Sequence, residues 1–138
     1  MTSSKHHSGT ILVADDDTAV QLLIGRVLKM QGFSVVTAVD GPSVVEALKS
    51  HGEQIRLVLL DLTMPGMSGA EMIRQIKEVR PEIPILVMTG HREADILPQL
   101  EAGEITGFLG KPFKPPELLE KIQQALGEDG ANPTRDRP

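Results

Sequence analysis

The chain has 138 residues, the length of one domain, which is enough to bury a sizeable hydrophobic core. Its formal net charge of −5 and the lack of a basic stripe argue against a nucleic-acid surface. Without cysteine it can form neither disulfides nor thiolate metal sites, and no apolar run approaches the length of a membrane span or signal peptide. We therefore expect a cytoplasmic protein with no membrane partner.

The first part of the chain alternates short apolar runs with segments of helical period. The apolar runs have the length of strands, whereas the helical segments repeat their apolar residues every three or four positions. In the first helical segment the repeating residues are Val20, Leu23, Val27 and Met30. In chain order, the pattern predicts a flexible leader over 1–9, a strand over 10–14, a helix over 19–30, a strand over 33–38 and a helix from the turn at 40–42 to about residue 50.

The stretch from Ile55 to Gly69 is the most informative in the sequence. After Arg56, residues 57–60 form an apolar run that ends abruptly in Asp61, and a loop rich in turn-forming residues follows. Such a run is typical of a strand buried on both faces, as in a parallel sheet covered by helices. Asp61 would then lie at the carboxyl edge of the sheet, where open α/β folds bind their ligands.

The rest of the chain continues the alternation. The segment 91–103 has a helical pattern, but Pro98 should shorten or kink any helix there. Around it, the pattern predicts a helix over 70–79 with Met72, Ile73 and Ile76 on one face, strands over 85–88 and 105–109, a helix over 115–126 with Leu118, Leu119, Ile122 and Leu126 on its inner face, and a disordered tail or linker over 127–138.

Strands that alternate with helices through short connections define the fold class. They predict an α/β domain over residues 10–126, with a doubly wound, five-stranded parallel sheet and helices on both faces.

Reactive side chains follow several strands of this predicted sheet, all at its carboxyl edge. They are Asp15 and Asp16, Asp61, Thr89 and Lys111. Three carboxylates in one cleft repel each other, which would raise their pKa values unless a cation is present. Mg²⁺ suits such a set of oxygen ligands. Thr89 can donate a hydrogen bond to a phosphoryl oxygen, and Lys111 can offset its charge.

From Thr10 to Leu126, the sequence resembles the receiver domain of two-component response regulators. The resemblance rests on the acidic pair Asp15-Asp16, the segment DLTMPGMSG from Asp61 to Gly69, the pair Thr89-Gly90 and the segment FLGKPF from Phe108 to Phe113. It implies a flavodoxin-like fold with strand order 2-1-3-4-5. The residues of the last two motifs resemble those of receivers in hybrid sensor histidine kinases more than those of stand-alone regulators.

The resemblance also implies a chemistry. Asp61 would accept a phosphoryl group from a phosphohistidine on a sensor histidine kinase or a histidine phosphotransfer domain. Mg²⁺, or Mn²⁺ as a substitute, would be bound directly by Asp16, Asp61 and the backbone carbonyl of Thr63, and through water by Asp15. The domain would be a phosphorelay signalling module, not an enzyme, that assists its own phosphorylation and dephosphorylation and forms a phosphorylation-linked homodimer.

In such a receiver, Thr89 and Lys111 would bind the phosphoryl oxygens. Movement of Thr89 would be coupled to an inward turn of Phe108, which remodels the face of the fourth helix, fifth strand and fifth helix. The peptide bond between Lys111 and Pro112 would be cis, because it is cis in the family.

Two positions depart from the family pattern. Phe108 stands where the family has Tyr, so no hydroxyl can latch the inward state. Many receivers have Asn where this chain has Thr63. Thr63 and His91 flank the expected path of the attacking water and could tune the lifetime of the phosphoryl group.

Three other functions fit the sequence less well. A pseudo-receiver that binds partners without phosphorylation usually lacks the acidic pair, the acceptor or the lysine, and all are present here. A Mg²⁺-dependent aspartyl-phosphate phosphohydrolase needs a second Asp two residues after the nucleophile, where Thr63 stands. A nucleotide-binding domain needs a glycine-rich motif after the first strand or a phosphate loop, and Pro112 replaces the required Ser or Thr after Lys111.

Overall fold

The computed structural model describes residues 9–64, 66–90 and 105–127. The predicted leader up to residue 8, the helical segment with His91 and Pro98, and the tail from residue 128 lie outside the described residues. In chain order, the elements are β1 (Thr10–Ala14), α1 (Thr18–Met30), β2 (Ser34–Ala38), α2 (Gly41–His51), the 3₁₀ helix η2 (Gly52–Gln54), β3 (Ile55–Asp61), α3 (Gly69–Val79), β4 (Ile85–Thr89), β5 (Gly107–Gly110) and α5 (Pro115–Leu126).

The strands form one parallel sheet in the order β2-β1-β3-β4-β5, which confirms the predicted fold class. Register brings the strand ends together at one edge. Ala14 pairs with Leu60 and Asp61 pairs with Met88, so Asp15 and Asp61 come next to each other across β1 and β3. Because Thr89 pairs with Gly110, Lys111 follows directly at the same edge.

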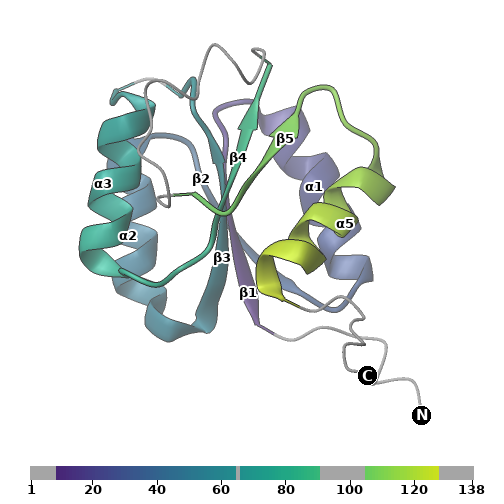
Figure 1. The fold of residues 1–138 in the computed structure, drawn as a ribbon, viewed down its shortest axis with the longest axis horizontal. Helices are drawn as coiled ribbons and strands as arrows, with labels where there is room; N and C mark the ends of the chain where they lie inside the picture. The colour runs from purple at the N-terminus through teal and green to yellow at the C-terminus, as the bar shows by residue number, and fades with distance from the viewer. Residues whose placement is uncertain (1–8, 65, 91–104, 128–138) are drawn as a thin grey trace.

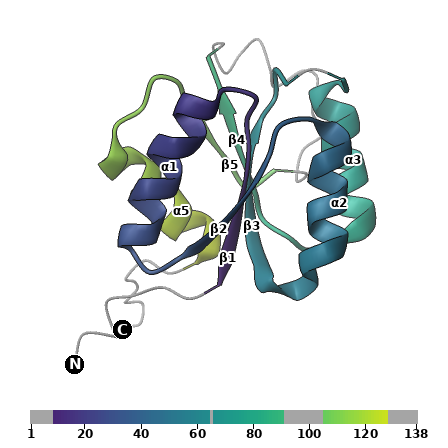
Figure 2. The same ribbon diagram turned by 180° about the vertical axis from the view of Figure 1, so that it is seen from behind.

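Helices cover both faces of the sheet, with α2 and α3 on one side and α1 and α5 on the other (Figures 1 and 2). β1 and β4 are buried along their whole length, as a strand between two helical layers requires. Alternate residues of one strand therefore enter different cores, Leu12 on the α2–α3 side and Ile11 on the α1–α5 side. Among the described residues, no helix is long and apolar enough to span a bilayer.

Helix caps shape the loops that leave this edge. Asp17 caps α1, since its carboxylate accepts hydrogen bonds from the N–H groups of Ala19 (2.9 Å) and Val20 (3.3 Å). Asp40 and Ser68 cap α2 and α3 in the same way. The side chain of Asp17 therefore caps α1, and the candidate site residues in this loop are the adjacent Asp15 and Asp16.

The structure corrects two details of the predicted elements. The repeat Val20-Leu23-Val27-Met30 located α1 but not its buried face, because Leu23 is 46% and Met30 76% exposed. The residues of α1 that are buried are Gln21, Ile24, Gly25 and Leu28. β5 begins at Gly107, paired with Leu86, instead of at residue 105. Just before it, Thr106 is bonded to Ile85 twice: its N–H donates to the Ile85 carbonyl at 2.7 Å, and its hydroxyl accepts the N–H of Ile85 at 3.2 Å.

Candidate functional site

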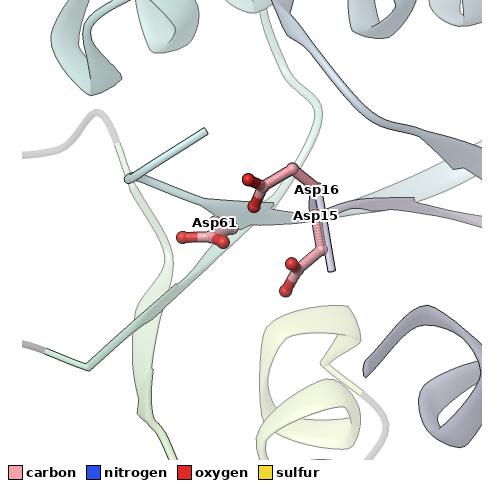
Figure 3. Close-up of side chains that lie close together, drawn as sticks. All are labelled: Asp15, Asp16 and Asp61. Carbon is pink, nitrogen blue, oxygen red and sulfur yellow. The ribbon is translucent and has the colours of Figure 1, made fainter. Parts of the chain in front are cut away.

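Three carboxylates meet at the carboxyl edge of the sheet. Asp15 and Asp16 follow β1, Asp61 ends β3, and Figure 3 shows the three side chains close together. One oxygen of each lies within 4.8 Å of the others. Asp15 and Asp61 are buried, with 0% and 2% of their surface exposed, whereas Asp16 is exposed. Such burial of two carboxylates requires compensating donors or cations.

Lys111 supplies the first compensation. Its Nζ donates to Asp15 Oδ2 at 2.8 Å and to Asp61 Oδ2 at 3.2 Å, so one ammonium bridges both buried carboxylates. The backbone holds Lys111 in place, because its N–H donates to the Thr89 carbonyl at 2.8 Å. The peptide bond between Lys111 and Pro112 is cis.

Thr63 supplies the second compensation. Its N–H and its hydroxyl both donate to Asp61 Oδ1, at 2.9 and 2.7 Å. Burial alone would raise the pKa of Asp61, but the two Thr63 hydrogen bonds and Lys111 together outweigh it, so this pKa lies below its usual value. Asp61 is therefore ionised at neutral pH, which is the state that a nucleophilic carboxylate needs.

The pKa values of Asp15 and Lys111 are both raised, but for different reasons. Burial raises the pKa of Asp15 above its usual value, although hydrogen bonds from Lys111 and the Asp17 N–H oppose the shift. Burial would lower the pKa of Lys111, but its contacts with Asp15 and Asp61 outweigh this and raise it. The lysine is therefore charged at neutral pH.

The donor set fits a hard divalent cation. Within the described parts of the chain, three carboxylates face one ammonium, which leaves an excess of negative charge on clustered oxygens. Mg²⁺ prefers such oxygen donors and completes its shell with water and phosphate oxygens. Asp15, Asp16 and Asp61 fit the ion, and the Thr63 carbonyl lies in the loop immediately after Asp61.

The structure also places the other predicted residues. Thr89 is buried (3% exposed) at the end of β4, on the strand next to Asp61. Phe108 in β5 is half-buried, pairs with Val87 and packs against the core on the α2–α3 side. His91 lies outside the described residues.

The sequence motifs gave no indication of two features near the site. Gln21 is a buried polar residue of α1 whose amide is hydrogen-bonded to the loop after β1. Gln21 belongs to none of the motifs, and the apolar repeat that starts at Val20 does not show that this position is buried. The second feature is an apolar groove of about 310 Å³ beside Lys111, lined by Val20, Leu23, Lys111, Pro112 and Phe113.

The sequence has relatives among known regulators and sensor kinases. NtrC of Escherichia coli K12, a DNA-binding transcriptional regulator, is 31% identical over 118 residues, which is 86% of this chain and 25% of NtrC. The sensor kinase CckA of Brucella abortus is 29% identical over 119 residues, which is 86% of this chain and 13% of CckA. The chain thus spans a quarter or less of these relatives.

The fold has solved counterparts. A chain in the CheX–CheY–BeF3–Mg²⁺ complex from Borrelia burgdorferi is similar with a TM-score of 0.76 and 26% identity, over 83% of this chain and 87% of that chain. Residues 11–123 match the family model described as the response regulator receiver domain. Since this match covers most of the chain, including every residue of the acidic cluster and Lys111, the protein belongs to the response regulator receiver domain family.

Proposed function

We propose that this domain is the phosphoacceptor of a two-component phosphorelay and that Asp61 takes a phosphoryl group from a phosphohistidine on a sensor histidine kinase or a histidine phosphotransfer domain. The observation that carries the proposal is the setting of Asp61. Its carboxylate is buried and has a lowered pKa, with Lys111 at 3.2 Å and two further carboxylates beside it. A structural aspartate at a strand end does not need this arrangement.

In the proposed transfer, a carboxylate oxygen of Asp61 forms a bond to phosphorus while the nitrogen–phosphorus bond of the phosphohistidine breaks. The electron pair of that bond returns to the imidazole, and the product on this chain is an acyl phosphate. Asp15, Asp16, Asp61 and the Thr63 carbonyl would hold Mg²⁺, which when bound supplies positive charge to the phosphoryl oxygens. The Lys111 ammonium would leave the Asp61 carboxylate, contact the phosphoryl oxygens and so offset their remaining charge.

The signal would leave the site through β4 and β5. Thr89 would donate its hydroxyl to a phosphoryl oxygen, and the inward turn of Phe108 on the neighbouring strand would follow. This is a two-state element biased by a local change of charge. Of the described elements, β5 and α5 would belong to the output face, together with the predicted fourth helix, which lies outside the described residues. A phosphorylation-linked homodimer would form there.

The apolar groove beside the site suits the phosphodonor. A donor histidine must reach Asp61, so the protein that carries it must also contact the surface around Lys111. The groove is lined by Lys111 itself and by Leu23, which is 46% exposed. An apolar side chain of the donor protein would fill this groove while the phosphohistidine enters the acidic cluster.

The test of the acceptor assignment is intact mass after incubation with Mg²⁺ and acetyl phosphate. Wild type should gain one phosphate in a Mg²⁺-dependent way, and Asp61→Asn should gain none. Asp17→Asn is the matched control, because Asn caps a helix as well as Asp does and the substitution keeps the backbone N–H that donates to Asp15. Unchanged labelling of Asp61→Asn would refute the assignment.

Beryllium fluoride, a mimic of the phosphoryl group, resolves a negative result. A wild type that takes up neither acetyl phosphate nor beryllium fluoride with Mg²⁺ would be a pseudo-receiver. Release of free phosphate with many turnovers per chain would instead favour the phosphohydrolase.

A further inference from the structure

Gln21 joins three parts of the fold through one side-chain amide. It lies on the buried face of α1, with 9% of its surface exposed. Its Nε2 donates to the backbone carbonyl of Asp15 at 2.7 Å and to that of Ala38 at 2.9 Å. The N–H of Asp15 donates to the same Ala38 carbonyl at 3.0 Å. The amide therefore ties the loop after β1 to both α1 and the end of β2.

The carbonyl that Gln21 holds belongs to the peptide between the two acidic residues. Ladder pairing of β1 ends at Ala14, so the chain leaves the sheet at Asp15. The orientation of the Asp15–Asp16 peptide sets the direction in which both side chains emerge. This matters most for Asp16, whose exposed side chain is not fixed by packing.

We infer that Gln21 is a positioning residue of the acidic cluster: it holds the Asp15–Asp16 peptide so that both carboxylates stay within ligand distance of Asp61. The inference rests on the proposed function, because the cluster is taken to bind Mg²⁺. Without the donor, the buried carbonyl of Asp15 would be left unsatisfied, and the loop would turn toward water to recover a hydrogen bond.

Groups that orient metal ligands typically contribute about 10–100-fold to metal affinity. Gln21 acts on the backbone of the ligands instead of on the carboxylates, so we expect the lower end of that range. Gln21→Met keeps the length and the helix propensity of the side chain but removes both hydrogen bonds.

Two controls separate positioning from general stability. Leu28→Val removes one methylene from the same buried face of α1, so it weakens the helix packing without touching the loop. Gln75→Met makes the same substitution in α3, where the amide of Gln75 bonds only to the partly exposed Glu71 among the described residues.

The experiment is calorimetric titration of Mg²⁺ into the unphosphorylated proteins, because the chain has no Trp for a fluorescence signal. Affinity for Mg²⁺ should fall about tenfold in Gln21→Met and stay within about twofold of wild type in both controls. In the metal-free protein, hydrogen exchange measured by NMR should be faster at the Asp17 N–H, which donates to Asp15 Oδ1 at 2.8 Å.

An affinity of Gln21→Met within twofold of wild type would overturn the inference, as would an equal loss in Leu28→Val. Absence of Mg²⁺ binding in wild type would overturn this inference and the metal site together. Wild type that binds Mg²⁺ but gains no phosphate, with weakened binding in Gln21→Met, would support the role of Gln21 and count against the phosphoacceptor function alone.

Discussion

Replacing Lys111 by Met tests how the buried carboxylates are stabilised before any metal binds. The substitution keeps a side chain of similar length but removes the ammonium that contacts Asp15 at 2.8 Å and Asp61 at 3.2 Å, whose side chains are 0% and 3% exposed. Removing one partner of a buried ion pair costs about 3–5 kcal/mol, because the remaining charge is left uncompensated. The Lys111 side chain is itself 24% exposed, so we expect a smaller loss, about 2–3 kcal/mol at pH 7.5.

The stability lost in Lys111→Met should depend on pH. In wild type the lowered pKa of Asp61 contributes stability above the unfolded value of about 3.9, and this contribution is lost as the pH falls through the lower folded value. Without Lys111, the pKa values of Asp61 and Asp15 both rise. A carboxyl whose folded pKa lies above its unfolded pKa binds more protons when folded, so its contribution falls as the pH rises. The difference in the free energy of unfolding between Lys111→Met and wild type should therefore be smaller at pH 4.5 than at pH 7.5.

Urea unfolding followed by far-UV circular dichroism, with metal removed by chelation, measures these differences. Lys121→Met is the control, since it removes an exposed lysine of α5 and should change stability by less than about 0.5 kcal/mol. Added Mg²⁺ should restore stability to Lys111→Met, by about 2.7 kcal/mol at a hundred times its dissociation constant. Equal stability of Lys111→Met and wild type at pH 7.5, or a loss that is the same at both pH values, would refute the reasoning.

Three further changes test other parts of the site. Asp16→Ala should weaken Mg²⁺ binding about tenfold or more, and an unaltered calorimetric titration would remove Asp16 from the ligand set. Thr63→Val deletes the hydroxyl that donates to Asp61 at 2.7 Å, so the pKa of Asp61, followed by NMR of its carboxyl carbon, should rise; an unchanged value would show that this hydrogen bond contributes nothing in solution. Leu23→Asp should slow transfer from a phosphohistidine protein about tenfold or more while labelling by acetyl phosphate is unchanged, and an equal loss with both donors would contradict the docking role of the groove.

Much of the fold follows from patterns that are local in the sequence. The apolar run before Asp61 is a strand because a stretch of Leu and Val that is buried on both faces leaves little alternative. In α3, Met72, Ile73 and Ile76 are buried as their spacing predicts, since the helix has a single apolar stripe. The residues of the site could also be predicted from the sequence. Parallel strands place their ends at one edge of the sheet, and Asp15, Asp61 and Lys111 lie at such ends.

Other features were decided only by the tertiary structure. α1 has apolar residues on more than one side, so periodicity located the helix but could not choose between Leu23 and Ile24, and packing between the sheet and α5 buried Ile24. Because α1 packs with Ile24 inward, Gln21 is also buried and its amide reaches the loop after β1. The ion pair of Lys111 with Asp15 joins residues 96 apart, and its 2.8 Å distance depends on strand order and register. Those are set by the packing of the whole sheet between its helices, which no local pattern of residues encodes.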